Sequence, residues 1–141
     1  MSASPRSTAA PAPRGQCQAI DMAGKIDLID GHWQPRVVAE MNDYQFKVVK
    51  LEGDFIWHKH DETDETFIVL DGELRIDVRG GPSGDGSIML RAGQMAVVPR
   101  GVEHKPCAAR EVKVLLIEPR GVANTGDGAT SERTVANDQW I

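Results

Sequence analysis

The chain has 141 residues, of which 40% are hydrophobic, so it is long enough for one domain whose core needs no disulfide or metal to stabilise it. A net charge of −5, without any Lys/Arg cluster, argues against nucleic acid as a partner. No apolar run approaches the roughly 20 residues of a membrane span, no secretory signal is recognised, and two cysteines are too few for a disulfide framework. We therefore expect a cytoplasmic protein with reduced thiols.

The N-terminal part of the chain differs in composition from the rest. Residues 1–16 are mostly Ser, Ala, Pro and Arg, and they bury too little apolar surface to offset the entropy of ordering. We expect a flexible tail over residues 1–17. From Gln18 to Asp30 apolar residues recur every three positions, which predicts one short amphipathic helix that Gly31 ends.

After Pro35, short runs rich in Val, Ile and Phe alternate with turn residues, and no helical period persists. The segment ELRIDVR has the period of a half-buried strand, and the Asp71-Gly72 pair before it is a hairpin signal. Many short strands at this spacing indicate a sandwich or barrel of antiparallel sheet. We predict strands at 36–40, 44–51, 55–60, 65–70, 73–79, 86–90, 94–98, 102–108 and 112–117.

These patterns predict a single domain over residues 18–141, with a barrel core at about 36–118 and a C-terminal extension at 119–141. The extension is polar and rich in glycine, but it ends in Trp140 and Ile141. Because exposing these apolar side chains to water is unfavourable, we expect the end to dock on the body of the domain or on a second subunit.

Two of the four histidines lie in the segment WHKHDETDETF. Alternate side chains share a face of a strand, so His58 and His60 are expected to point together. The side chains expected on the opposite face are Phe55, Trp57 and Lys59. Buried imidazoles need polar partners, whereas a neutral imidazole nitrogen is the commonest protein ligand of transition metals. The histidine pair therefore predicts two adjacent metal ligands.

A carboxylate and a third imidazole come from other segments. Glu65 opens the next strand and, if it faces inward, shares its side with apolar residues, while Glu62 and Asp64 lie in the turn and are expected to face solvent. In a distant strand, His104 shares a face with Val102. The predicted site therefore contains three imidazoles and one carboxylate: His58, His60, Glu65 and His104.

Three other polar positions have less specific interpretations. His32 precedes the barrel and is interpreted as a surface or packing residue, and Cys107 falls on the opposite face from the histidine site as a small buried residue. Lys47 lies with Tyr44 and Gln45 on an early strand near the mouth of the barrel. It is either an ordinary surface lysine or a group that steers an anionic ligand.

The chain resembles the cupin family, whose fold is an all-β, double-stranded β-helix of the jelly-roll type. The first cupin motif is matched by Gly53, His58, Lys59, His60, Glu65 and Gly72, with the first glycine one position nearer the histidines than is usual. The second motif is matched by Gly93, Pro99, Arg100, Gly101 and His104. Ala108 stands where that motif usually ends in Asn, which removes a side-chain hydrogen bond but no metal ligand. The resemblance extends over roughly Val37 to Glu118 and is strongest to small single-domain bacterial cupins, often called mannose-6-phosphate-isomerase-like.

The resemblance implies that the three imidazoles and the carboxylate hold one divalent transition metal ion. On a six-coordinate ion this set leaves two positions for water, oxygen or a substrate. Mixed nitrogen and oxygen ligands suit Mn, Fe(II), Co, Ni or Zn and do not choose among them, while the lack of thiolates argues against a closed structural zinc site. The alternative is a barrel in which the cluster is only hydrogen-bonded.

An open metal position can polarise an oxygen atom, generate hydroxide or bind dioxygen beside a chelating substrate. We therefore expect a metal-dependent enzyme acting on a small oxygen-rich molecule, and the resemblance implies isomerisation or dioxygenation. The alternatives are a non-catalytic module that binds a small ligand or senses metal, and a structural storage-type cupin, which typically lacks the ligand set. Small cupins commonly pair, so we expect a homodimer that forms through the strand at 36–40 or the Trp-bearing end.

Overall fold

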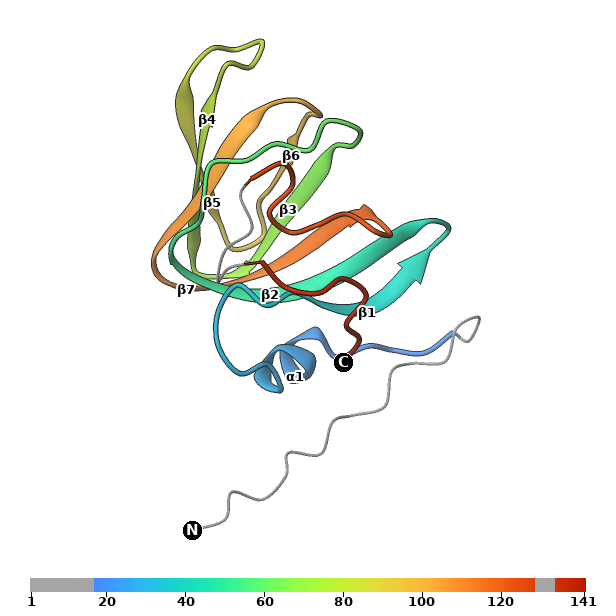
Figure 1. Ribbon diagram of the computed structural model, residues 1–141. Coiled ribbons are helices and arrows are strands. Elements are labelled where there is room, and N and C mark those ends of the chain that lie inside the picture. Colours follow the sequence, from blue (N-terminus) through green and yellow to red (C-terminus); the bar gives the residue numbers. More distant parts are fainter. Residues whose placement is uncertain (1–16, 129–133) are drawn as a thin grey trace.

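In the computed structural model, which describes residues 17–128 and 134–141, the chain forms an antiparallel barrel of the jelly-roll type with one short helix (Figure 1). The predictions of an all-β fold and of a short N-terminal helix are confirmed. Of the tail predicted at residues 1–17, all but Cys17 lie outside the described residues. No helix in the described part of the chain combines the length and apolar character needed to span a bilayer.

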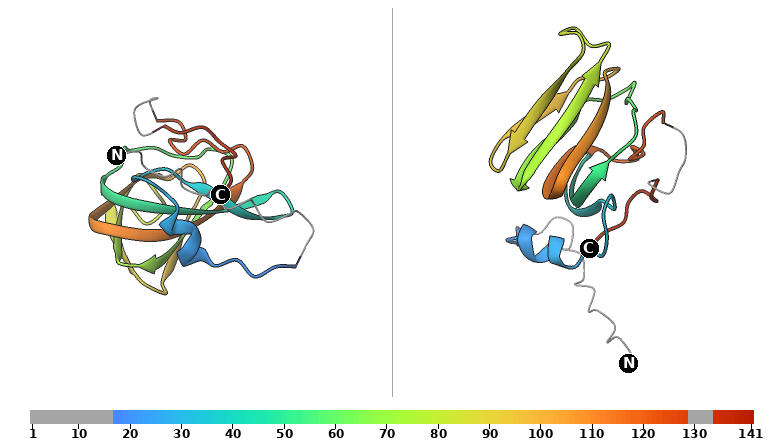
Figure 2. Two further views of the ribbon diagram at one scale, coloured as in Figure 1. Left: turned by 90° about the horizontal axis from the view of Figure 1, so that it is seen from below. Right: turned by 90° about the vertical axis from the view of Figure 1, so that its left-hand side faces the viewer.

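The predicted strands from 36–40 to 94–98, other than 55–60, correspond to β1 through β6. The elements in chain order are α1 (Met22–Asp27), β1 (Arg36–Met41), β2 (Tyr44–Asp54), β3 (Glu65–Asp71), β4 (Glu73–Arg79), β5 (Gly86–Arg91), β6 (Met95–Val98) and β7 (Glu103–Pro119). The sheet follows the order β1-β2-β7-β3-β6, and β4 pairs with both β5 and β7. The sheet curls on itself, so the inner faces of its strands meet around one core (Figure 2).

The 17 residues of β7 are the spine of the barrel. Along one side β7 pairs with β2, and along the other it pairs first with β4 and then with β3. The prediction of two strands at 102–108 and 112–117 is wrong, because the residues between them continue the extended backbone. These residues, Ala109, Arg110 and Glu111, are exposed. Their composition is typical of a turn, but their backbone continues as part of the strand.

A corner, not a hairpin, joins β3 to β4. Pairing with β7 runs to Asp71 in β3 and resumes at Arg75 in β4, and the described strands β3 and β4 do not pair with each other. The hairpin predicted from the Asp71-Gly72 pair is therefore wrong. Gly72 has a φ of 91°, and a Cβ added there would lie 3.0 Å from the carbonyl oxygen of Glu111. Glycine is required because the corner passes close to the backbone of β7.

The strand predicted at 55–60 is also wrong, because this extended segment makes only one isolated bridge, between His58 and His104. Phe55 donates its backbone N–H to the carbonyl of Pro106 at 2.9 Å. Proline has no N–H with which to return the bond, so a continuous ladder cannot form there. The Phe55 side chain is buried in the core and does not lie on the outer face as predicted.

A second apolar cluster packs α1 and the end of the chain against the outside of the barrel (Figures 1 and 2). The helix is shorter than the predicted 18–30, because Asp21 is its N-cap and Leu28 its C-cap, but its apolar face packs as expected. Ile141 is buried and donates its N–H to Val37 at 3.1 Å, so the chain end docks on the body of the same molecule. The buried members of this cluster are Ile26, Ile29, Val38, Val48, Leu115 and Ile141.

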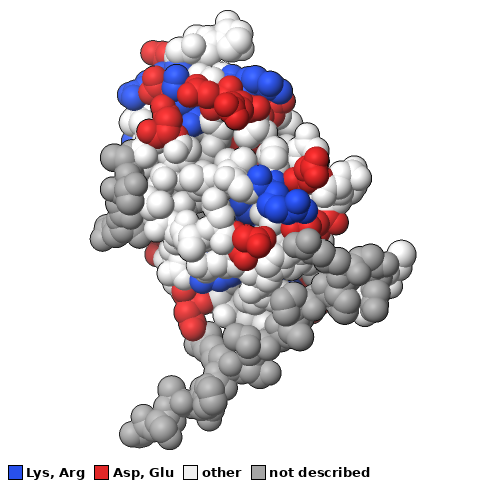
Figure 3. Space-filling model, turned by 45° about the vertical axis from the view of Figure 1, so that its right-hand side comes forward, with Lys and Arg blue, Asp and Glu red and all other residues white. Residues whose placement is uncertain are grey.

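Charged side chains of both signs are interspersed on the face shown in Figure 3. Several charged side chains of the barrel are paired, as in the Arg79–Glu103 contact at 2.7 Å and the Arg75–Asp77 contact at 3.0 Å. Pairs of this kind at the surface add little stability.

Candidate metal centre

The backbone itself aligns two of the predicted ligands. Within the segment between β2 and β3, His58 pairs with His104 of β7 through two hydrogen bonds, from His58 N to His104 O at 3.0 Å and from His104 N to His58 O at 2.8 Å. Directly opposed residues of such a bridge place their side chains on the same face. The two imidazole rings accordingly lie with their centroids 4.2 Å apart inside the barrel.

Local hydrogen bonds also orient these two rings. The Nδ1 atom of His58 lies 2.9 Å from the carbonyl oxygen of Ile56, and the Nδ1 atom of His104 lies 2.9 Å from that of Val102. A carbonyl oxygen only accepts, so each Nδ1 must carry the proton. In the neutral imidazole, Nε2 is then left with a free lone pair, which is the form that binds a metal.

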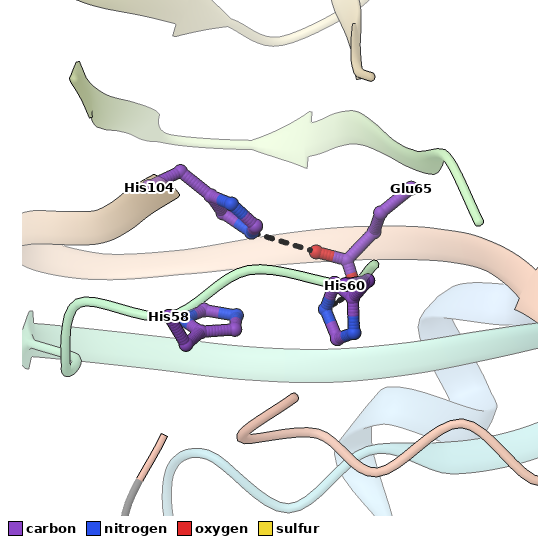
Figure 4. Close-up of side chains that lie close together, drawn as sticks. All are labelled: His58, His60, Glu65 and His104. Carbon is purple, nitrogen blue, oxygen red and sulfur yellow. Dashed lines mark hydrogen bonds and ion pairs between the residues drawn. The ribbon is translucent and has the colours of Figure 1, made fainter. Parts of the chain in front are cut away.

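Glu65 and His60 complete the cluster (Figure 4). The carboxylate oxygens of Glu65 lie 3.3 Å from Nε2 of His104 and 3.3 Å from Nε2 of His60. The latter contact lacks hydrogen-bond geometry, so Nε2 of His60 is buried without a hydrogen-bond partner among the described residues. One atom from each of the four side chains lies within 4.8 Å of the others, and all four residues are buried. The structure thus brings together every predicted ligand.

Burial and charge put these groups in the ionisation states that metal binding needs. Burial, aided by the nearby His104, lowers the pKa of His58 to about 4. Burial alone would raise the pKa of Glu65, but the interactions of its carboxylate with His104, His60 and Glu118 outweigh it and hold that pKa well below its usual range. His58 is therefore neutral and Glu65 ionised at neutral pH.

The donor atoms fit a divalent transition metal. The lone pair on Nε2 of His104 faces an ionised carboxylate oxygen, and two acceptors at that distance need a cation or a proton between them. The unpartnered Nε2 of His60 has the same requirement. Three nitrogen donors and one oxygen donor suit Mn, Fe, Co, Ni or Zn. That the four residues hold such an ion stays a prediction.

A segment that the sequence analysis did not identify packs behind the cluster. Asp127 accepts a hydrogen bond from Lys59 N at 2.7 Å and donates its own N–H to Lys59 O at 3.1 Å. Gly126 has a φ of 52°, and a Cβ there would overlap the Lys59 carbonyl oxygen and lie 3.1 Å from the His60 ring. We call residues 123–128 the strap. Its two hydrogen bonds hold Lys59, the residue between the two histidines.

The remaining sequence interpretations divide into two groups. His32 lies at the surface, 2.8 Å from Glu111, and Cys107 is buried away from the cluster with Asp77 3.8 Å from its sulfur, both as expected. The interpretation of Lys47 as a surface lysine is wrong, because its side chain is buried against Glu118. The signal lies in alternation, since Lys47 shares a face with apolar residues of β2.

The chain belongs to the cupin family, because the family described as Cupin_2, a cupin domain, matches residues 46–118, more than half of its length. A crystal structure of a cupin-2 domain protein from Shewanella frigidimarina is 54% identical, with 72% of this chain and 94% of that chain covered and a TM-score of 0.67. The prediction of a cupin barrel is thereby confirmed.

Two more distant proteins extend this comparison. The uncharacterized protein YdbB of Bacillus subtilis is 34% identical over 68 residues, which are 48% of this chain and 57% of that protein. The crystal structure of hydroquinone 1,2-dioxygenase from Sphingomonas sp. TTNP3 with 4-hydroxybenzoate bound is 23% identical, with 77% of this chain and 35% of that chain covered and a TM-score of 0.66. At this identity the likeness shows the fold alone.

Replacing a predicted ligand is expected to remove the metal. In His60→Asn, affinity for a divalent ion should fall by more than about tenfold, because a buried donor nitrogen is lost. Elemental analysis after dialysis against limiting metal measures this directly. His32→Asn is the matched control and should retain as much metal as the wild type. Equal metal content in both variants would contradict the assignment.

Loosening the strap is expected to weaken metal binding without removing a ligand. Asp127→Ala should lower metal affinity about tenfold, because groups that hold ligands in place typically contribute 10- to 100-fold. Isothermal titration with Zn²⁺ measures the change. Asp85→Ala is the control, since Asp85 accepts a similar bond from Gly80 N at 2.8 Å far from the site. A loss of the same size in both variants would show that the strap has no special role.

The metal-free protein should become less stable as the pH falls from about 6.5 towards 4. In this range an unfolded His58, with a pKa of about 6.5, takes up a proton before the folded one, whose pKa is about 4. The expected loss at pH 4 is about 3 kcal/mol in the free energy of unfolding. Urea unfolding of chelator-treated protein measures it, and His58→Asn should lack this part of the pH dependence. Identical profiles for the two proteins would refute the expectation.

Proposed function

We propose that the protein is a metal-dependent enzyme of the dioxygenase type that acts on a compact, oxygen-bearing molecule with an apolar body. The observation that carries this proposal is the buried cluster of His58, His60, Glu65 and His104, of which His58 and Glu65 line a cavity in the barrel. Two of the residues that would hold a metal therefore also form part of the wall of a cavity. Such an arrangement supports chemistry on a bound molecule better than a closed structural site does.

The cavity favours a small ligand with little charge. His58 and Glu65 form part of its wall, and its volume is about 40 Å³, enough for a few water molecules and far below the roughly 300–1,000 Å³ of sites for drug-sized ligands. Neither Lys nor Arg lines it among the described residues. The apolar side chains that line it include Trp33, Val49, Leu51, Phe55, Phe67 and Leu116.

This lining favours dioxygenation over the isomerisation of sugar phosphates, the other reaction type that the family resemblance implies. A sugar phosphate needs hydrogen-bonding groups and cations, whereas the cavity presents stacked aromatic rings, with the centroids of Trp33 and Phe55 4.8 Å apart. Solved hydroquinone 1,2-dioxygenases share the fold, and their structures hold Fe³⁺ or 4-hydroxybenzoate. Those ligands belong to the dioxygenases, and they support the choice of test compounds here.

Each part of the site has a task in this proposal. His58, His60, Glu65 and His104 would hold the ion, which supplies Lewis-acid and redox chemistry when bound. The Ile56 and Val102 carbonyls keep two of the imidazoles in the form that binds metal. The aromatic and aliphatic wall excludes bulk water and stacks against the body of the ligand, which strengthens every polar contact inside.

The alternative is a non-catalytic module that binds a small ligand or senses metal. The observation that favours it is the small cavity, which admits a ring-sized molecule only if lining side chains move.

A homodimer and a cytoplasmic location also stay predictions. The edge strand β1 is partly covered by the chain's own Trp140, which bridges to Val37, so this edge is less open to a second copy than predicted.

Oxygen uptake distinguishes the two functions. Protein loaded with Fe(II) without oxygen and then mixed with catechol, hydroquinone or acetylacetone in aerated buffer should consume oxygen with at least one of them. The metal-free protein and the Glu65→Gln variant should not. Mannose 6-phosphate should be neither isomerised nor bound. Full metal occupancy without oxygen uptake from any compound would favour the binding module.

A further inference from the structure

A buried ion pair lies next to the cavity. Lys47 Nζ is 2.7 Å from Glu118 Oε1, and the two side chains are only 5% and 1% exposed. Lys47 comes from β2 and Glu118 from the C-terminal end of β7, two strands that already pair along their lengths. Replacing a buried ion pair by apolar residues is often neutral or stabilising. Joining β2 to β7 therefore does not explain why this pair is there.

The two oxygens of Glu118 have different surroundings. Lys47 occupies Oε1, whereas Oε2 is buried without a hydrogen-bond partner among the described residues. Glu118 lines the cavity, and it interacts with the adjacent ligand residue Glu65. These two are the carboxyl groups among the described cavity-lining residues, and Glu65 already faces the histidines. An unsatisfied buried oxygen is unfavourable unless something in the cavity partners it.

We propose that Glu118, held in place by Lys47, is the residue that recognises a hydroxyl group of the ligand. The inference rests on the proposed function, because it assumes that a small molecule enters the cavity beside the metal ligands. A hydroxyl group donates to a carboxylate and accepts from a carboxylic acid, so it pairs with Glu118 in either state. The ligand is then a compact molecule with an apolar body that stacks on Trp33 and Phe55 and a hydroxyl group that reaches Glu118.

The arrangement defines Glu118 as a specificity-determining residue and Lys47 as a positioning residue. Lys47 does not line the cavity, but it fixes one oxygen of Glu118 and thereby the direction of the other. The selectivity between ligands follows from the free energy lost when a ligand leaves Glu118 without a hydrogen-bond partner. A site built to hydrogen-bond a hydroxyl rejects an analogue that lacks it, because the buried polar group is then left unpaired.

The test compares two probes of nearly equal size, catechol and 1,2-difluorobenzene, which has no hydroxyl group. Their binding to the full chain loaded with Zn²⁺ is measured by titration calorimetry, so no turnover is needed. Wild-type protein should prefer catechol. Glu118→Leu should weaken catechol binding about tenfold and change 1,2-difluorobenzene binding by less than about twofold. Glu118→Gln should restore most of the preference, because an amide also donates and accepts.

Two controls keep the test decisive. The double variant Lys47→Met with Glu118→Leu replaces the whole pair by apolar side chains, so it should fold even if the single change leaves Lys47 buried and uncompensated. It should lose the preference for catechol while keeping its zinc. Glu111→Gln, an exposed carboxyl change, should leave both affinities unchanged.

Three results would overturn the proposal. One is an undiminished preference for catechol in the double variant. Another is a loss that follows the zinc content of the variants, which would reduce Glu118 to a support for Glu65. The third is a wild-type protein, fully loaded with zinc, that binds neither probe at millimolar concentration. Failure of oxygen uptake with intact discrimination between the probes would reject the proposed reaction and leave the recognition by Glu118 standing.

Discussion

Two backbone hydrogen bonds between His58 and His104 determine where the candidate metal centre lies. They fasten a segment that belongs to no strand onto β7 and thereby bring an imidazole from each side to the same spot. Everything else adjusts to that contact: the carbonyls that orient the rings, Glu65 across the interior, and the strap behind His60. The result is a cluster of hydrogen-bond acceptors in a buried region of low dielectric constant, where a cation interacts most strongly with them.

Much of the fold was predictable because period-2 alternation is a local property. Strands β3 and β4 show it within a few residues, and the histidine pair shows it as well. The errors arose where a distant residue decides the outcome. Pro106 prevents Phe55 from joining a ladder, and β7 supplies partners to both β3 and β4, which turned an expected hairpin at Gly72 into a corner. No local pattern reveals which strand lies alongside.

The polar interior was predictable only in part. Two imidazoles one residue apart are conspicuous, whereas Lys47 and Glu118 look like ordinary surface charges until their neighbours are considered. Each shares a strand face with apolar residues, and that alternation was the usable signal. What alternation cannot supply is the pairing of the two groups across β2 and β7, which depends on register. The strap escaped prediction because it is a polar, glycine-containing loop without strand or helix periodicity, and its contacts with Lys59 join residues far apart in the sequence.

The central position of β7 affects the order in which the barrel can fold during synthesis. The strand that pairs with β2, β3 and β4 follows all of them in the chain, so during synthesis these three leave the ribosome before their common partner exists. Until then their unpaired edges can pair with other chains. This exposure is typical of barrels, because strands far apart in the sequence pair slowly. The barrel therefore cannot close until the last strand in the chain pairs with its three earlier neighbours.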